Sequence, residues 1–505
     1  PMEMVHWSTC MHGWQARPPD PEIVGDRWRA MWLERLEQPP WIEHWLAHQR
    51  RDAYWQQGSV RDDYSRIACP VLCVAGWTDG YSDAALRLME GLAVPRHALI
   101  GPWGHNDPVH GVPGPAVGIL DELVRWWDRW LKGIDSGIAD DPMVVAYVQD
   151  PVQPVANLAE RPGRFVGEQT WPSPRIAPRS LALGNATLGV PSPSGTRSIG
   201  SVQTVGLEGG AWCADGRSAD LPLDQRGEDA RSLTYDSDPL AASLELLGFV
   251  EARLVLSSDR PLALVSVRLC EVLEHGASLL VTRGQLNLCH RRSHAEPELL
   301  VPGEEIDVTV RLDAIGHRFA AGSRLRLSVS PCYWPLAWPS PEPVTLTLRH
   351  GSGAELVLPE RTPAADEIEL RPLAEPQEPE PLAYEVLATS NGGFRRIERD
   401  LGSGATRLVF DWDCGGRTRF ANGIEYEDTS VATYSINEDD PLSARVRVSN
   451  TSFYGRGDLQ VSIAAVGTMT CTAGTFLVTS ELEVSEGARP AFARTWTHEF
   501  PRDHC

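Results

Sequence analysis

Lysine is almost absent from this chain of 505 residues. Lys132 is the only one, so arginine supplies the rest of the 46 basic residues, against 68 acidic ones. The formal net charge of −22 argues against nucleic acid or an anionic membrane surface as a partner, because either would be repelled.

The sequence also has no CxxC pair, no apolar run that could span a bilayer and no secretory signal. Its ten cysteines show no regular spacing, which indicates reduced thiols and a cytoplasmic protein. The chain begins Pro1-Met2 without an initiator methionine. We therefore expect the first residues to be missing, and an upstream signal stays open.

The stretch from Cys69 to His105 carries the strongest functional signal. The apolar run 70–75 predicts a strand buried on both faces of a parallel sheet, and Asp79 follows it. A helix is expected over 83–92 and a second strand over 97–100, followed by His105. Because ligands bind outside the carboxyl ends of such strands, Asp79 and His105 should project at the same edge.

An acid after one strand and a histidine after the next is the tail of the Ser…Asp…His order of α/β-hydrolases. The carboxylate would fix the imidazole tautomer and leave the other ring nitrogen to take a proton from a serine. Simpler interpretations are that Asp79 is a turn residue before Gly80 and that His105 is bonded to backbone. Asp83 is the alternative acid, although its place suits a helix cap better.

The length predicts about three domains. Residues 1–65 are helical in pattern and rich in tryptophan, with helices expected over 22–36 and from Trp41 to about Gln49. They are expected either to form a cap over the active site or to be ordinary core. His44 and His48 have the spacing of a metal pair, but no third ligand lies nearby, so no metal is predicted.

Residues 66–140 are expected to be the C-terminal part of an α/β-hydrolase domain, ending in an amphipathic helix over 116–131. From about Met143 many short alternating strands predict a jelly-roll sandwich over 141–371. A Pro/Glu-rich linker follows at 372–383, and residues 384–505 are expected to form a second, smaller β-sandwich. The fold class is therefore α/β followed by all-β.

Four stretches resemble the cocaine esterase and Xaa-Pro dipeptidyl-peptidase family of serine hydrolases. They are Gly-Trp-x-Asp-Gly at 76–80, Gly-Pro-Trp-x-His at 101–105, the helix end at 126–133, and jelly-roll pieces that include 316–325. The resemblance spans roughly residues 60–345. It implies that Asp79 is the catalytic acid and His105 the base, and it suggests Trp77, Trp103, Tyr333 and Trp334 as pocket residues.

The family's Gly-x-Ser-x-x-Gly nucleophile elbow cannot be placed on this sequence. Thr78 and Ser82 are the available substitutes, and both are poor ones: Ser82 opens the helix after Asp79, and Thr78 merely has the outline of an elbow. We expect this chain to carry the acid and base without the nucleophile, and so to be inactive alone. We disfavour a partner chain that supplies the missing half, because splitting a parallel sheet leaves unpaired strand edges and exposed apolar faces.

The resemblance implies hydrolysis of an ester, an amide or a peptide bond through an acyl-enzyme, possible self-association, and no cofactor. A non-catalytic remnant or a β-sandwich binding protein is the alternative, because jelly rolls are frequent binding modules. The substrate and the role of 384–505 do not follow from the sequence.

Overall fold

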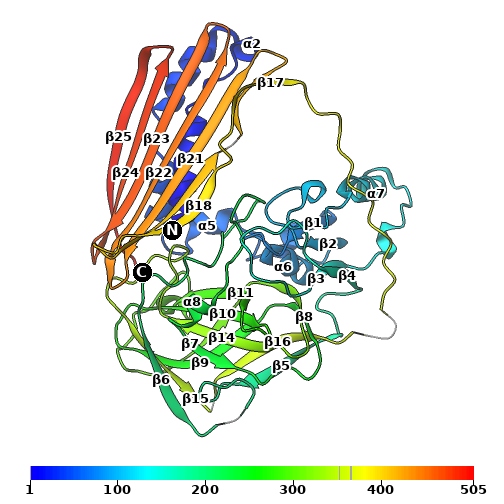
Figure 1. Cartoon of the computed structure of the whole chain (residues 1–505). Helices are drawn as coiled ribbons and strands as arrows, with labels where there is room; N and C mark the ends of the chain where they lie inside the picture. Colours follow the sequence, from blue (N-terminus) through cyan, green and yellow to red (C-terminus); the bar gives the residue numbers. More distant parts are fainter. Residues whose placement is uncertain (1, 191, 352, 364–366, 414) are drawn as a thin grey trace.

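The computed structural model describes residues 2–190, 192–351, 353–363, 367–413 and 415–505. Three parts are visible in Figure 1: a small α/β part, a β-sandwich below it, and a tall sheet of long strands lined by helices. The α/β part and the sandwich share one continuous sheet of twelve strands.

The α/β part has the predicted order of strand, helix and strand. β1 and β2 pair in parallel from Val71 opposite Arg96 to Gly76 opposite Gly101, and β2 pairs in parallel with β3. Gly133, in the left-handed conformation, ends the last helix. The elements are β1 (Val71–Gly76), α6 (Asp83–Gly91), β2 (Arg96–Gly101), α7 (Ile119–Lys132) and β3 (Val144–Gln149).

Two details of this part differ from the sequence-based expectation. The parallel sheet continues through β3, so it extends past the boundary expected at residue 140. β1 is also less buried than its apolar run predicted, with Val74 36% exposed. The reason is that β1 is an edge strand, paired only with β2 among the described residues.

The predicted jelly-roll sandwich is confirmed as two packed sheets. A four-stranded sheet in the order β11-β10-β14-β7 faces the larger sheet, and a continuous apolar core lies between them. The strands are β4 (Gly163–Glu168), β5 (Ile176–Ala182), β6 (Gly195–Gly200), β7 (Leu233–Asp236), β8 (Leu244–Gly248), β9 (Glu251–Ser258), β10 (Leu264–Val272), β11 (Ser278–Asn287), β12 (Ile306–Arg311), β13 (Ile315–Phe319), β14 (Arg324–Ser330), β15 (Thr345–His350) and β16 (Glu355–Arg361).

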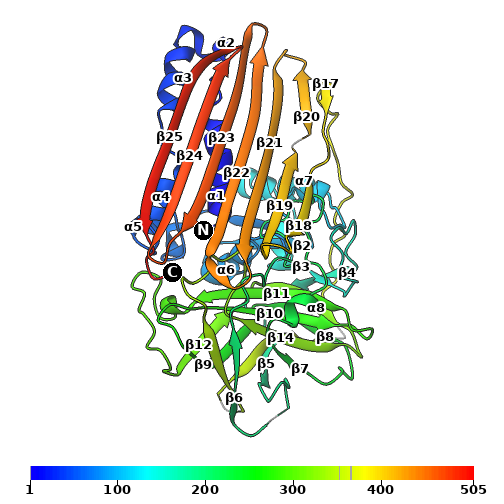
Figure 2. The ribbon, with the colours of Figure 1, turned by 60° about the vertical axis from the view of Figure 1, so that its left-hand side comes forward.

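The last part is one sheet, which corrects the expectation of a second sandwich. Nine antiparallel strands form it, and helices cover its apolar face where a second sheet was expected. Figure 2 shows the long strands side by side with α1 and α3 behind them. The strands are β17 (Tyr384–Thr389), β18 (Phe394–Arg399), β19 (Ala405–Asp413), β20 (Gly416–Phe420), β21 (Glu425–Asn437), β22 (Asp440–Arg456), β23 (Leu459–Cys471), β24 (Thr475–Glu486) and β25 (Arg489–Pro501).

The helices that cover this sheet come from the N-terminal segment, so its tryptophan-rich helices contribute to a core, which is the second of the two alternatives that the sequence left open. α1 packs on β22 and β23, and α4 contacts β25. Trp32 is fully buried in a cluster with apolar side chains of β23 and β24. The helix expected over 22–36 is interrupted at Gly25, whose φ of 63° caps α2. The helices are α1 (Met2–Gln15), α2 (Pro21–Val24), α3 (Trp28–Leu36), α4 (Trp41–Ala47) and α5 (Ala53–Gln57).

The predicted linker is an extended segment that lies against the α/β part. Its Ala374 carbonyl accepts a hydrogen bond from the Gly118 N–H, and Leu373 packs beside Trp103 and Val117. The remaining short elements are α8 (Arg226–Asp229), η1 (Gly25–Arg27), η2 (Tyr64–Arg66), η3 (Pro108–His110), η4 (Ile138–Asp140) and η5 (Leu288–His290).

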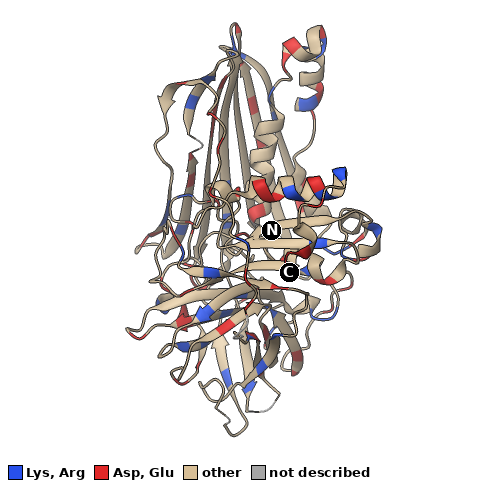
Figure 3. Cartoon of the chain, turned by 90° about the vertical axis from the view of Figure 1, so that its right-hand side faces the viewer, with Lys and Arg blue, Asp and Glu red and all other residues tan. Residues whose placement is uncertain are grey.

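On the face drawn in Figure 3, acidic and basic residues are interspersed over helices and strands. Among the described residues, no helix combines the length and the apolar character needed to cross a membrane.

Candidate functional site

Asp79 and His105 occupy equivalent places, each in the loop just after a parallel strand. The two loops are joined by backbone hydrogen bonds, from the Trp77 N–H to the Gly101 carbonyl at 3.0 Å and from the Thr78 N–H to the Trp103 carbonyl at 3.0 Å. The close approach requires glycine, because a Cβ on Gly76 would lie 2.0 Å from the Trp103 carbonyl oxygen. The strand ends therefore fix Asp79 and His105 at the same edge.

The two side chains meet as the sequence predicted. His105 Nδ1 lies 2.9 Å from Asp79 Oδ2, and the other carboxylate oxygen accepts the Tyr81 N–H at 2.9 Å. With Nδ1 as the donor, this arrangement leaves Nε2 as the basic nitrogen of the ring. The imidazole is 57% exposed while the carboxylate is only 13% exposed, so the acid is sheltered and the base faces outward.

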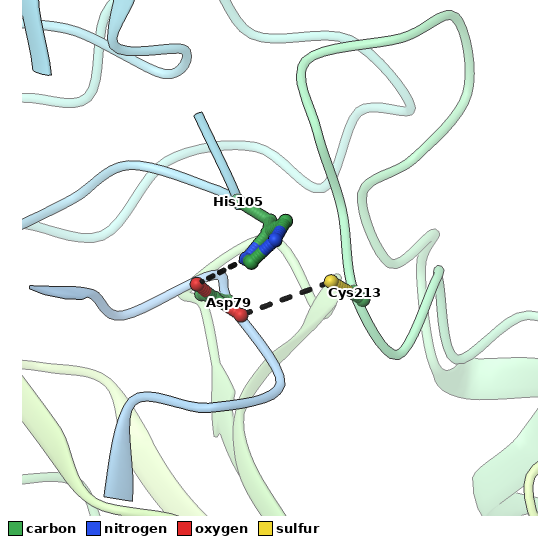
Figure 4. A group of neighbouring side chains, drawn as sticks. All are labelled: Asp79, His105 and Cys213. Carbon is green, nitrogen blue, oxygen red and sulfur yellow. Dashed lines mark hydrogen bonds and ion pairs between the residues drawn. The ribbon is translucent and has the colours of Figure 1, made fainter. Parts of the chain in front are cut away.

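A third side chain, Cys213, joins this pair from a loop of the β-sandwich part. Its thiol donates a hydrogen bond to Asp79 Oδ1 at 3.8 Å, and Figure 4 shows the sulfur and the His105 ring joined to different oxygens of this carboxylate. Burial raises the pKa of the Cys213 thiol to about 12, and the negative charge of Asp79 acts in the same direction. The thiol is therefore protonated at neutral pH. No sequence motif marks this residue.

Open space lies on both sides of the pair. One groove runs between the edge of β1 and α7, and its lining includes Val74, Asp79, His105 and Leu123. A second pocket lies between the α/β part and the sandwich and also touches Asp79. That pocket contains opposite charges: burial raises the pKa of Asp313 to about 6 and lowers that of Arg161 to about 10.

The two tryptophans suggested as pocket residues have different surroundings. Trp77 lines the second pocket and donates its indole N–H to the Tyr147 carbonyl at 2.6 Å. Trp103 is 1% exposed and donates to the Pro115 carbonyl at 2.8 Å, beneath the His105 loop. It contributes to the groove mainly as a buried support.

Tyr333 and Trp334 do not lie at the site, which corrects the pocket predicted for them. Tyr333 is 1% exposed beside Val205 and Cys332, and Trp334 is fully buried with Trp338 in the core beneath the long sheet. The physical reason is that the N-terminal helices and the long strands cover the Pro-rich loop that carries these two residues.

The alternative acid Asp83 and the substitute nucleophile Thr78 have structural hydrogen-bond partners, and the other substitute, Ser82, is buried. Asp83 accepts the Ala314 N–H at 2.8 Å and pairs with Arg87 at 2.6 Å, so it joins α6 to the sandwich. The Thr78 hydroxyl donates to the Pro102 carbonyl at 2.9 Å. Ser82 is 3% exposed at the start of α6. These contacts leave Asp79 as the acid that meets His105.

The two histidines at the spacing of a metal pair, His44 and His48, contact other side chains. His48 Nδ1 lies 2.5 Å from Asp52 and its ring stacks on Tyr54, while the His44 ring packs against Trp41. No disulfide joins any of the nine cysteines that the structure describes; Cys414 lies outside the described residues.

Two segments of the chain match known families. Residues 3–107 match the X-Pro dipeptidyl-peptidase S15 family, and residues 136–362 match the non-catalytic C-terminal domain of X-Pro dipeptidyl-peptidases. A parallel sheet that carries an acid and a histidine on successive loops, followed by a jelly roll, defines the class as α/β-hydrolase with an appended β-sandwich.

Curated relatives agree with these matches. A Mycobacterium bovis protein named as a serine esterase is 28% identical over 308 residues, covering 55% of this chain and 46% of its own length. Cocaine esterase of a Rhodococcus species is 25% identical over 325 residues, covering 59% and 54%. The chain thus spans about half the length of the curated relatives it matches. It belongs to the cocaine esterase and X-Pro dipeptidyl-peptidase family.

Solved structures share the fold. An α-amino acid ester hydrolase matches with a TM-score of 0.53 at 20% identity, over 66% of this chain and 62% of that one. An aminopeptidase from a marine-sediment Thaumarchaeota archaeon matches with a TM-score of 0.52 at 18% identity, over 70% and 63%.

Proposed function

We propose that Asp79 and His105 are the acid and base of a serine hydrolase. The observation that carries this proposal is the 2.9 Å contact between His105 Nδ1 and Asp79 Oδ2, made between loops that follow neighbouring parallel strands. A carboxylate in this position holds the imidazole in one tautomer and stabilises its protonated form. His105 would take the proton of the nucleophile and later deliver it to the leaving group.

In the proposed mechanism the nucleophile belongs to a part of the complete protein that this sequence does not include. Thr78 is bonded to a carbonyl and Ser82 is buried, so neither presents a free hydroxyl to His105. The edge of β1 offers a place for a further strand, because it has no described partner on its outer side and exposes Val74. We expect the chain alone to be inactive, since little catalysis remains once a triad member is absent.

The proposed reaction is hydrolysis of a small ester, amide or peptide through an acyl-enzyme. The names of the relatives, a serine esterase and cocaine esterase, support the ester class as the first to be tried. The groove beside His105 and the pocket beside Asp79 are the two places where the parts of such a substrate would lie.

The test uses the complete protein that the gene encodes, assayed with a short-chain nitrophenyl ester. His105→Ala should lower kcat by at least about 10³-fold, because the general base is lost. His110→Ala is the matched control: this neighbouring histidine is exposed and pairs with Glu378, so its loss should leave the rate within about twofold.

A rate that survives His105→Ala would overturn the proposal. A gene product with no upstream serine elbow, no esterase activity and no labelling by a serine-reactive probe would favour the non-catalytic alternative.

A further inference from the structure

Asp79, His105 and Cys213 lie close together, although the proposed hydrolase mechanism needs only the first two. Each offers one ligand atom, and these atoms lie within 4.8 Å of one another. Among the residues that the structure describes, this is the only set of three such side chains close enough to share one ion. The hydrolase proposal uses the first two residues and leaves the thiol without a role.

We propose that these three side chains bind a zinc ion. One carboxylate oxygen, one imidazole nitrogen and one sulfur are ligands that zinc accepts, with bonds of about 2.0–2.3 Å. A tetrahedral site with such bonds places its ligand atoms about 3.3–3.8 Å apart, so the three atoms need to move together by roughly 1 Å. The presence of sulfur and nitrogen favours zinc over magnesium or calcium, which take oxygen ligands.

The loop that carries Cys213 is held firmly against the His105 loop. The His105 N–H donates to the Ala214 carbonyl at 2.5 Å, and Arg283 donates to the Ala211 carbonyl at 3.0 Å. A Cβ on Gly104 would lie 2.3 Å from the Ala214 oxygen. Three ligands brought together by fixed backbone lose little conformational freedom when they bind an ion.

The electrostatic surroundings also suit a cation. The carboxylates of Asp79, Glu3 and Asp215 are near enough to Cys213 to act on it electrostatically. The same negative charges attract a divalent ion, which would displace the thiol proton to solvent and form the zinc–sulfur bond. Because the His105 ring is 57% exposed, water can reach the fourth position of the ion.

Zinc binding and the proposed acid–base role exclude each other. An ion held by Asp79 and a nitrogen of His105 occupies the groups that would orient the base and move its proton. We therefore expect zinc to inhibit the complete hydrolase. The inference itself does not depend on that activity, because it concerns residues of this chain and can be measured by binding.

The test adds Co²⁺, as a spectroscopic substitute for zinc, to the reduced, metal-free chain. A thiolate–cobalt charge-transfer band in the near ultraviolet should appear and should vanish when zinc displaces the cobalt. Cys213→Ser should abolish the band. Cys69→Ser should keep it, because Cys69 is an exposed cysteine outside the group.

Alkylation of the unmutated chain provides a second measurement that needs no variant. Zinc at ten times its dissociation constant should slow alkylation of Cys213 about tenfold and leave Cys69 unaffected, as read by peptide mass spectrometry. Cobalt binding without a thiolate band, a band that persists in Cys213→Ser, or alkylation of Cys213 that zinc does not slow would each overturn the proposal. None of these outcomes bears on the hydrolase proposal.

Discussion

Asp79 is a shared hydrogen-bond acceptor at the centre of the site. One of its oxygens contacts His105, and the other accepts the Tyr81 N–H and the Cys213 thiol. A carboxylate held on both oxygens has few orientations open to it. The loop therefore fixes the direction from which the imidazole is supported.

The Asp79→Asn substitution tests this supporting role in the complete enzyme. An amide of the same shape no longer stabilises the imidazolium and can hold the ring in the wrong tautomer, so kcat should fall by about 10³–10⁴-fold with little change in KM. Steady-state kinetics measure both constants. Asp128→Asn, which alters a carboxylate on α7 paired with Lys132, should behave as the unchanged enzyme; equal losses in the two variants would count against a specific role for Asp79.

The sequence predicted Asp79 and His105 because both lie in loops whose place follows from the strands before them. It could not predict Cys213, which lies 134 positions from Asp79 in a loop without regular structure. Nothing in the surrounding residues fixes where such a loop will pack. Tyr333 and Trp334 were suggested as pocket residues by the family resemblance alone, and the strands and helices around their loop bury both side chains.

At the scale of the elements, the long strands show that the pattern of buried and exposed residues along a strand does not identify what packs on its buried face. Buried and exposed residues alternate along β22 and β23, so the sequence predicted a half-buried antiparallel sheet. Alternation is the same whether a second sheet or a layer of helices lies on the apolar face. The choice depended on the N-terminal tryptophans, which had been considered for a cap.

Trp32 tests the packing of these helices on the sheet. It is fully buried and donates its indole N–H to the Ala16 carbonyl at 2.7 Å. Trp32→Ala should lower the local free energy of opening by about 3–5 kcal/mol, seen as faster hydrogen exchange of amides in β23 and β24.

Trp7→Ala provides the control, because Trp7 is 47% exposed and should cost at most about 1 kcal/mol. Unchanged exchange in β23 and β24 after the loss of Trp32 would mean that the sheet is stable without its helical layer.

At the scale of the whole molecule, a buried arginine joins the sandwich to the segment that leaves it. Arg361 at the end of β16 contacts Glu168 at 2.7 Å, Glu245 at 2.6 Å and Glu367 at 2.6 Å. The guanidinium and the first two carboxylates are almost completely buried. Burial without a partner would be costly for each of these groups.

This cluster predicts how stability changes in acid. The hydrogen bond from Arg361 lowers the pKa of Glu367 from 4.5 to about 2. A carboxylate whose pKa is lower in the folded chain contributes stability above its unfolded pKa, and that contribution is lost as the pH falls toward 2. Thermal melting from about pH 7 to pH 2 should therefore show Glu367→Gln less stable than the unchanged chain near neutrality and equal to it in acid.

Glu360→Gln serves as the comparison, because Glu360 pairs with Arg179 at the surface and should change melting little at any pH. If the difference caused by Glu367→Gln stayed constant down to pH 2, the ionised carboxylate would not be its source.

The contact between the first helices and the last strands has a consequence for synthesis on the ribosome. Arg29 and Glu486, which bond across this contact, lie 457 positions apart. At about 5–20 residues per second, the helices emerge roughly 20–90 s before the strands that cover them. During this interval the apolar face that includes Trp32 lacks the strands β23 and β24 that cover it, and nascent chains on one messenger could associate through this face. Chaperone binding to the first fifty residues would protect the yield of folded protein.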